Sequence, residues 1–162
     1  MLCSHILFAI SVLADGGTLI CKAYEIETQF TAGLVYLLYR QFENVTIVKP
    51  VTSRPINSER YIIAKCKVGD SHNLEEYLLE HLFRHKNSSL GNLVPPAITN
   101  ENLFSKYIFR SYKTLAEKQL LHIENLINYG RYVQLEQSEI QRKFSKYAYS
   151  KWNIPLAKIN RV

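Results

Sequence analysis

Cysteine is scarce in this sequence and its pattern is sparse. Three cysteines occur among 162 residues, Cys3, Cys21 and Cys66, and no two of them form a C-x-x-C pair. An odd number at wide spacing argues against a disulfide framework and against a zinc site. We therefore expect no metal in this chain, and we expect Cys21 and Cys66 to behave as small apolar core residues.

A long hydrophobic run is also missing. The most apolar stretch is the amino-terminal MLCSHILFAISVLA, residues 1–14, which is too short to span a bilayer. Its position allows a second interpretation as a signal peptide, but no basic residue precedes the apolar part. We favour a buried helix that packs on a sheet, and we expect no membrane partner.

What is present is a pattern of strand, helix and strand. Thr18–Tyr24 is a short apolar run typical of a strand buried on both faces, and Lys22 interrupts it near its end. Thr31–Phe42 has helical spacing, and Val45–Lys49 and Tyr61–Cys66 are two further strands. This order predicts an α/β fold in which a helix crosses over between two parallel strands. A doubly wound sheet has about five or more strands, so we expect these to be the carboxyl-terminal portion of a longer sheet.

The third strand returns after a short segment that contains two prolines. That segment leaves no room for a second crossover helix, so we expect this strand to be antiparallel to the first two. If it lies beside the first strand, the SRPINSE segment and Glu59 arrive at the edge where Lys22 emerges. Open α/β sheets bind ligands at that edge, beyond the carboxyl ends of the parallel strands. The sequence therefore predicts that the Lys22 ammonium meets the Glu59 carboxylate.

The residues that form this pattern also carry a family resemblance. The run from GGTLICKAYEIET to YIIAKCKVG resembles the second half of the catalytic domain of the FtsJ/RrmJ-like, cap-specific mRNA nucleoside-2'-O-methyltransferases. The likeness is strongest over residues 5–69, and the ending KWNIPLAKINRV is similar to that family's close. These enzymes methylate the ribose of the first transcribed nucleotide after the cap.

The resemblance implies a Rossmann-like methyltransferase fold, S-adenosylmethionine as cofactor and the capped mRNA 5' end as partner. It also implies residence in the nucleus. Residues 1–69 are then the carboxyl-terminal half of the methyltransferase domain, and residues 70–162 are a helical extension that packs on the sheet. Any contact of the parent protein with the transcription machinery is expected through regions outside this sequence.

The family's active site is a Lys-Asp-Lys-Glu tetrad. By resemblance, Lys22 in ICKAYE is its second lysine and Glu59 in NSERY is its glutamate. The first lysine, the aspartate and the glycine-bearing cofactor loop are expected before Met1. We therefore assign no cofactor-binding residue within this chain, and we expect the isolated chain to be inactive.

The resemblance makes Lys22 the proton acceptor and Glu59 the residue that orients it through a charge-assisted hydrogen bond. A free lysine has a pKa of about 10.4, which must fall to about 7–8 before the amine can act as a base. In the family, a second lysine supplies the neighbouring cation that lowers it. The alternative is a lysine at a strand end, paired with Glu25 or Glu27.

Three residues of the SRPINSE segment are candidate substrate contacts. By resemblance, Asn57 matches a position that contacts the substrate, although an asparagine beside Pro55 is equally typical of a turn. Arg54 can take a phosphate bidentately or can brace the loop against Glu59, and Ser53 lies beside it. Tyrosines that can stack on bases are Tyr24, Tyr36, Tyr39 and Tyr61, of which Tyr36 and Tyr39 are more typical of a core.

The rest of the chain is read as helices over residues 74–83, 100–129 and 137–151. His81 and His85 lie four residues apart, but no further ligand supports a metal site there. Residues 142–151, RKFSKYAYSK, are interpreted as a solvated face over a packed Phe144 and Tyr147.

The net charge of +6 favours an anionic partner without identifying one. Two functions stay open at this point. One is methyl transfer to the ribose of capped mRNA. The other is a non-catalytic RNA-binding or interaction module, derived from a truncated or degenerate paralogue.

Overall fold

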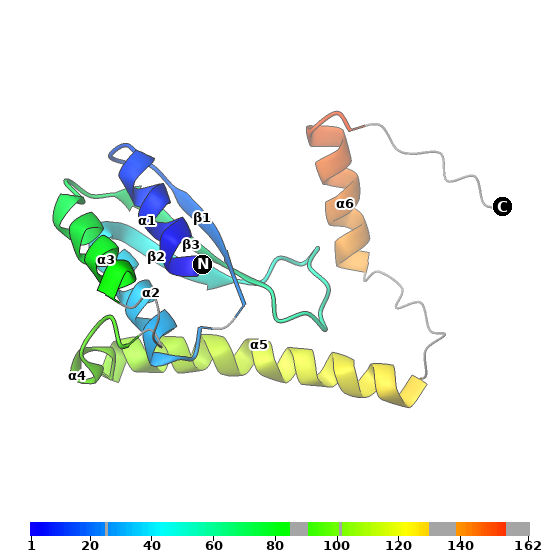
Figure 1. Cartoon of the computed structure of the whole chain (residues 1–162). Helices are drawn as coiled ribbons and strands as arrows, with labels where there is room; N and C mark the ends of the chain where they lie inside the picture. The colour runs from blue at the N-terminus through cyan, green and yellow to red at the C-terminus, as the bar shows by residue number, and fades with distance from the viewer. Residues whose placement is uncertain (25, 85–90, 101, 130–138, 155–162) are drawn as a thin grey trace.

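The computed structural model describes residues 1–24, 26–84, 91–100, 102–129 and 139–154. Three strands and six helices occur in this part of the chain (Figure 1). Their order is α1 (Leu2–Val12), β1 (Leu19–Ala23), α2 (Gln29–Gln41), β2 (Phe42–Val48), β3 (Arg60–Lys67), α3 (His72–Arg84), α4 (Pro96–Thr99), α5 (Asn102–Tyr129) and α6 (Glu139–Lys151). The α/β class and the helical second half predicted from the pattern are confirmed.

The strands form one sheet in the order β1, β3, β2. β3 is antiparallel to both neighbours, with Lys22 opposite Tyr61 and Val48 opposite Tyr61 on the other side. The antiparallel third strand beside the first is therefore confirmed. β1 and β2 run in the same direction, but they are not neighbours because β3 lies between them. No two neighbouring strands of the described sheet are therefore parallel.

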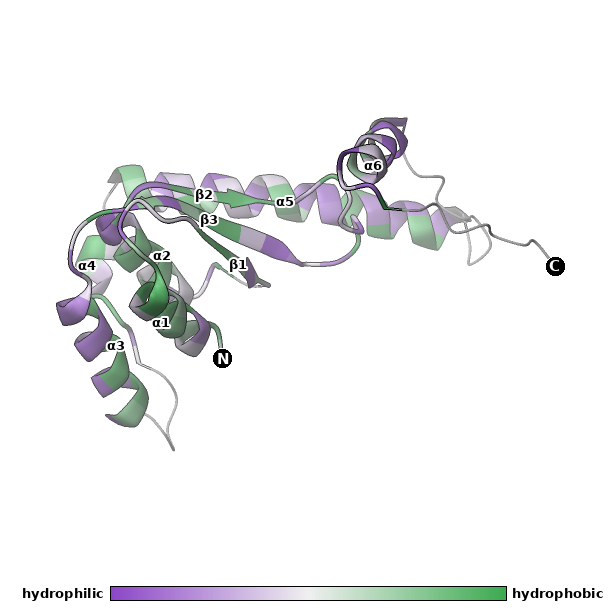
Figure 2. Cartoon of the chain, turned by 90° about the horizontal axis from the view of Figure 1, so that it is seen from above, coloured by the Kyte–Doolittle hydropathy of each residue, from purple (hydrophilic) through white to green (hydrophobic). Residues whose placement is uncertain are grey.

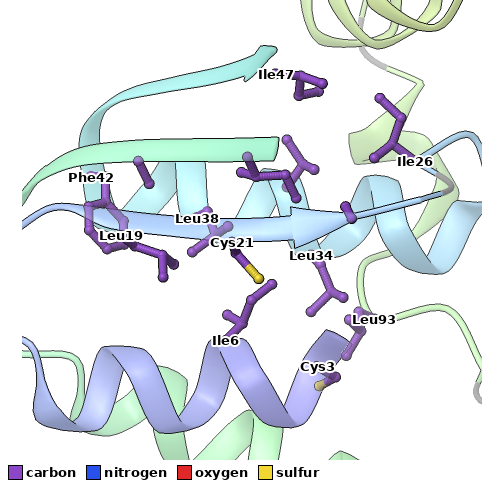
Figure 3. Packing of buried hydrophobic residues seen from close by; sticks show 14 of the residues in the cluster. Cys3, Ile6, Leu19, Cys21, Ile26, Leu34, Leu38, Phe42, Ile47 and Leu93 are labelled. Atoms are coloured by element: carbon purple, nitrogen blue, oxygen red, sulfur yellow. The ribbon is translucent and has the colours of Figure 1, made fainter. Parts of the chain in front are cut away.

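The buried side of the sheet is covered by α1 and α2. In β1, Leu19, Cys21 and Ala23 are buried, and Cys21 points toward Ile6 of α1 (Figure 3). The other side chains of β1 point away from this core, and Ile20 is 64% exposed. The expectation that β1 is buried on both faces is therefore wrong. In the described chain α1 and α2 pack against one face only, so burial alternates along the strand.

The amino-terminal stretch is the buried helix that we favoured. Cys3, Ile6 and Ile10 of α1 are buried in the core, and Figure 2 shows α1 as one of the most hydrophobic segments. Lys67 of β3 holds its end, because Nζ donates to the carbonyls of Ile10 (3.0 Å) and Leu13 (2.9 Å). None of the helices in the described residues has the length and apolar character needed to cross a bilayer.

Helix α5 runs along the edge of the sheet formed by β2 and extends beyond it (Figures 1 and 2). The Tyr107 hydroxyl of α5 accepts a hydrogen bond from the Ile47 backbone N–H at 3.0 Å. This bond satisfies a donor that an edge strand would otherwise leave open. Ile108 of the same helix is buried in the core. The first half of α5 is therefore built into the sheet domain.

Candidate functional site

The site lies where β1 ends and β3 begins. The antiparallel register places Lys22 of β1 directly opposite Tyr61 of β3, so Glu59 comes just before the paired segment. The two charged groups meet, with Lys22 Nζ 3.4 Å from Glu59 Oε2. The predicted meeting of these groups at a common rim is confirmed. Their catalytic roles stay predictions.

Neighbours of Glu59 hold its carboxylate from several sides. The Tyr61 hydroxyl donates to Oε1, and the Asn57 side-chain amide donates to Oε2 at 3.3 Å. The Glu59 backbone N–H in turn donates to Asn57 Oδ1 at 3.2 Å. The hydrogen bond from Tyr61, followed by that from Lys22, lowers the pKa of Glu59. Glu59 is therefore an ionised, well-oriented acceptor.

Lys22 is a protonated ammonium in this arrangement. Its side chain is 45% exposed, and Nζ lies 5.1 Å from the centre of the Tyr24 ring. Contact with Tyr24, followed by the hydrogen bond to Glu59, raises the pKa of Lys22. This direction is opposite to the one that a general base requires. The described neighbours orient Lys22, and a nearby cation would have to lower its pKa.

The alternative partners proposed for Lys22 are placed differently. Glu27 lies 3.6 Å from the guanidinium of Arg60, whose side chain is only 5% exposed. Glu25 lies outside the described residues. The interpretation of Lys22 as a strand-end lysine paired with Glu27 is therefore wrong, because the carboxylate beside it is that of Glu59.

The segment between β2 and β3 forms a hollow of about 270 Å³ beside this rim. Its lining residues are Pro50, Thr52, Ser53, Arg54, Glu59 and Tyr61. Two of the three predicted substrate contacts, Ser53 and Arg54, therefore share one concave surface with Glu59. Arg54 is exposed, and among the described residues it forms no ion pair with Glu59, so it does not brace the loop in that way.

Asn57, the third predicted contact, has a structural role in this loop. Its backbone N–H donates to the Arg54 carbonyl at 3.1 Å and closes a turn. Its side chain bonds both the backbone and the carboxylate of Glu59. The turn interpretation is confirmed, and substrate contact by Asn57 stays a prediction.

Sequence reasoning missed the roles of two residues beside the rim, Tyr61 and Lys49. Tyr61 was considered only as a stacking residue, whereas its hydroxyl bonds Glu59. Lys49 was not among the predicted substrate contacts, yet its Nζ donates to three oxygens of the loop, on Ser53, Asn57 and Glu59. The signal for Lys49 is its place at the end of a strand, immediately before a proline-containing loop.

Helix α5 contacts the site from its outer side. Gln119 Nε2 donates to the Ile56 carbonyl at 3.0 Å, and the Arg60 guanidinium lies 5.5 Å from the centre of the Tyr112 ring. Gln119 and Tyr112 were absent from the predicted site, because a contact between distant segments leaves no local pattern in the sequence.

Several secondary predictions differ from the structure. Tyr39, expected in the core, is exposed, whereas Tyr36 is partly buried and packs edge-to-face against Phe104. Phe144 and Tyr147, expected to be packed, are exposed on α6. Cys21 is buried as expected, but Cys66 is only partly buried and has a positive φ of 57°. His85, which was considered with His81 as a metal pair, lies outside the described residues.

Residues 1–67 match the family described as FtsJ-like methyltransferase. The chain is 34% identical over 165 residues to "Cap-specific mRNA (nucleoside-2'-O-)-methyltransferase 1" of Homo sapiens, covering 96% of this chain and 19% of that protein. The protein of the same name from Mus musculus is 35% identical with the same coverage.

A more distant relative gives a similar result. The protein of that name from Drosophila melanogaster is 31% identical over 161 residues, covering 92% of this chain and 20% of the relative. The chain thus spans about a fifth of the length of the curated relatives it matches, 19% in the human case. The likeness reaches beyond residues 1–67 into the helical half.

Proposed function

We propose, since residues 1–67 match the FtsJ-like methyltransferase family, that this chain carries the substrate side of the active site of a cap-specific mRNA 2'-O-ribose methyltransferase. The observation that carries the proposal is the contact of Lys22 Nζ with Glu59 Oε2 at 3.4 Å, at the ends of two antiparallel strands. The relatives' name supports the substrate class.

The rim residues have separable tasks in this reaction. S-adenosylmethionine supplies the methyl group when bound. Lys22 Nζ, once neutral, accepts the proton that the ribose 2'-hydroxyl loses as its oxygen bonds to the methyl carbon and the carbon–sulfur bond breaks. Glu59 orients the lysine, and Tyr61 and Asn57 hold Glu59. Holding the reactants in line contributes several kcal/mol, on the order of 7–11 in the best cases.

The donor and acceptor groups fit the ribose end of the reaction better than the cofactor end. The Glu59 carboxylate already accepts from Lys22, Tyr61 and Asn57, which leaves about one of its roughly four acceptor positions for any other partner. The hollow beside it, with Ser53 and the exposed Arg54, offers a hydroxyl and a guanidinium to a nucleotide phosphate. We therefore assign Ser53 and Arg54 to the first transcribed nucleotide, whereas the assignment of Asn57 rests on the family resemblance alone.

The raised pKa of Lys22 favours a second candidate function. An ammonium that Tyr24 and Glu59 keep protonated binds phosphate well and accepts no proton. A non-catalytic RNA-binding or interaction module would retain such a rim. The methyltransferase proposal requires a further cation near Lys22, the part that the family resemblance gives to another lysine.

The test is a chimera in which this chain replaces the matching segment of the human relative. We expect the chimera to methylate capped RNA at the 2'-oxygen. We expect Lys22→Ala to lower kcat about 100-fold or more, the usual contribution of a general base, and to leave capped-RNA binding largely intact. Lys65→Ala, an exposed lysine of β3, is the matched control and should turn over normally.

Two results would oppose the proposal. Normal turnover of the Lys22→Ala chimera would remove Lys22 from the mechanism. A chimera that binds capped RNA and S-adenosylmethionine without any methyl transfer would favour the RNA-binding module. Nuclear residence belongs to the same proposal, and the location of a fluorescent fusion of the parent protein tests it.

A further inference from the structure

We propose that Lys49 is a positioning residue of the same site: its ammonium folds the 50–59 loop into the shape that presents the Glu59 carboxylate to Lys22. This inference rests on the proposed function for its catalytic meaning. The positional claim itself concerns only contacts within this chain.

Three oxygens of the loop surround the Lys49 ammonium. Nζ donates to the Asn57 carbonyl at 2.5 Å, to the Glu59 carbonyl at 3.0 Å and to the Ser53 hydroxyl at 3.2 Å. A lysine ammonium has three donors. All of them are therefore used within the loop, and Lys49 has no donor left for a substrate phosphate.

The loop is built as turns around this cation. The Ser53 N–H donates to the Pro50 carbonyl at 3.0 Å, and the Asn57 N–H donates to the Arg54 carbonyl at 3.1 Å. These turns direct oxygens from both ends of the loop to one point. The positive charge of the ammonium offsets the repulsion between the partial negative charges of those oxygens.

The same loop residues connect Lys49 to the reacting pair. Asn57 gives its carbonyl to Lys49 and its side chain to Glu59, and the Glu59 carbonyl also accepts from Lys49. A change at Lys49 is thus transmitted to Glu59 through two short paths. Glu59 is the carboxylate within 3.4 Å of Lys22.

Loss of the ammonium leaves two carbonyls and a hydroxyl without their donor in a partly buried place. Unpaired buried acceptors are costly, so the loop is expected to turn them toward water and to carry Glu59 away from Lys22. Arginine keeps the charge, but its planar, forked group cannot bring three donors to one point. Lys49→Arg is therefore expected to resemble Lys49→Met.

The first experiment follows the Lys22 and Glu59 titrations by NMR in the full 162-residue chain, comparing the wild type with Lys49→Met, Lys49→Arg and the control Lys65→Met. If Lys49 positions Glu59, Lys49→Met lowers the pKa of Lys22, because its carboxylate partner withdraws. If Lys49 acts only through its charge, removing a neighbouring cation raises the pKa of Lys22 instead. The two explanations thus predict shifts of opposite sign.

The expected result is a lower Lys22 pKa and a higher Glu59 pKa in both Lys49 variants, with no change in Lys65→Met. An unchanged or raised Lys22 pKa in Lys49→Met overturns the proposal. If circular dichroism shows that Lys49→Met does not fold, the pKa values of Lys22 and Glu59 in the charge-preserving Lys49→Arg variant decide the question. An Lys49→Arg chain with wild-type titrations overturns the geometric argument.

The second experiment places Lys49→Met in the chimera with the human relative. We expect kcat to fall on the order of 10- to 100-fold, the cost of a displaced catalytic group, with the KM for S-adenosylmethionine unchanged. Wild-type kcat in that variant overturns the positioning role. Absence of turnover in the chimera without the Lys49 substitution would instead count against the proposed function. The NMR titration of Lys22 in the 162-residue chain would still test whether Lys49 positions Glu59.

Discussion

The sheet with α1 and α2 contrasts with the outer half of α5 in how each uses its apolar residues. Ile62 of β3 is 0% exposed, whereas Leu120 of α5 is 56% exposed. The sheet half carries apolar residues at periods that match its strands and helices, so they converge on one core. Along α5 they occur on more than one side, and the sheet edge covers only the first half of the helix.

This difference shows where the candidate site obtains its rigidity. The rim is held from within by the β1–β3 ladder and from outside by Tyr112 and Gln119 of α5. Beyond Gln119, the large apolar residues Leu120, Leu121 and Ile127 of α5 are exposed. The boundary between a structural strut and an exposed helix therefore falls within one continuous helix.

Truncation of a core residue should have the largest effect on the free energy of unfolding. Ile62→Ala leaves a cavity under α1 and α2, and we expect it to lower the free energy of unfolding by about 2–5 kcal/mol. Leu120→Ala, the matched change on α5, should alter it by less than about 0.5 kcal/mol. Urea unfolding measures both. Equal losses would mean that the outer half of α5 is packed.

Removal of the buried guanidinium should have a smaller effect. Arg60→Met breaks the contact with Glu27 at 3.6 Å and the packing on Tyr112. We expect a loss of about 1–3 kcal/mol, below the range for fully buried pairs because Glu27 is partly exposed. The same unfolding experiment checks it, with Lys65→Met as the control. An unchanged stability would show that α5 does not brace β3 through Arg60.

Removal of a single hydroxyl tests the inner half of α5. Tyr107→Phe deletes the acceptor for the Ile47 N–H, and we expect a loss of about 1 kcal/mol with faster hydrogen exchange of that amide. Tyr147→Phe on the exposed face of α6 should change neither quantity. An Ile47 amide that exchanges as slowly in Tyr107→Phe as in the wild type would contradict the edge contact.

The pH dependence of stability should show the smallest effect. Glu59 has a lowered pKa in the folded state, so its contribution is present above the unfolded value of about 4.3 and is lost as the pH falls through the folded value. The free energy of unfolding of Glu59→Gln should therefore approach that of the wild type as the pH falls. Lys22 has a raised pKa in the folded state, so its contribution to stability is fully present below the unfolded value of about 10.4. That contribution is lost as the pH rises through the folded value.

If the difference in free energy of unfolding between Glu59→Gln and the wild type stays constant from neutral pH to about pH 3, the ionised form of Glu59 does not stabilise the fold. Because both groups are partly solvated, salt should reduce the effect. The measurement therefore belongs at low ionic strength.

Much of the fold was predictable because local periodicity reports local conformation. The strands around Lys22, Val45 and Tyr61, and the helix ending near Phe42, were found within a few residues of their observed bounds. The direction of the third strand followed from the short loop before it. The meeting of Lys22 and Glu59 followed from that direction on the further condition that the third strand lies beside the first.

The remaining features needed contacts between distant segments. The insertion of β3 between β1 and β2 is a choice of pairing partner, which spacing does not encode. The exposure of Ile20 depends on which helices cover the sheet. The roles of Tyr61, Lys49 and Gln119 depend on hydrogen bonds whose partners lie on other segments.

The amino-acid sequence by itself determined the elements, the direction of the strands and the residues that share the rim, because these follow from side-chain period and loop length. Only the tertiary structure decided the protonation preference of Lys22 and the anchoring of the loop by Lys49. Both depend on distances of a few ångströms among Tyr24, Glu59 and the loop oxygens, to which electrostatic and hydrogen-bond energies are steeply sensitive.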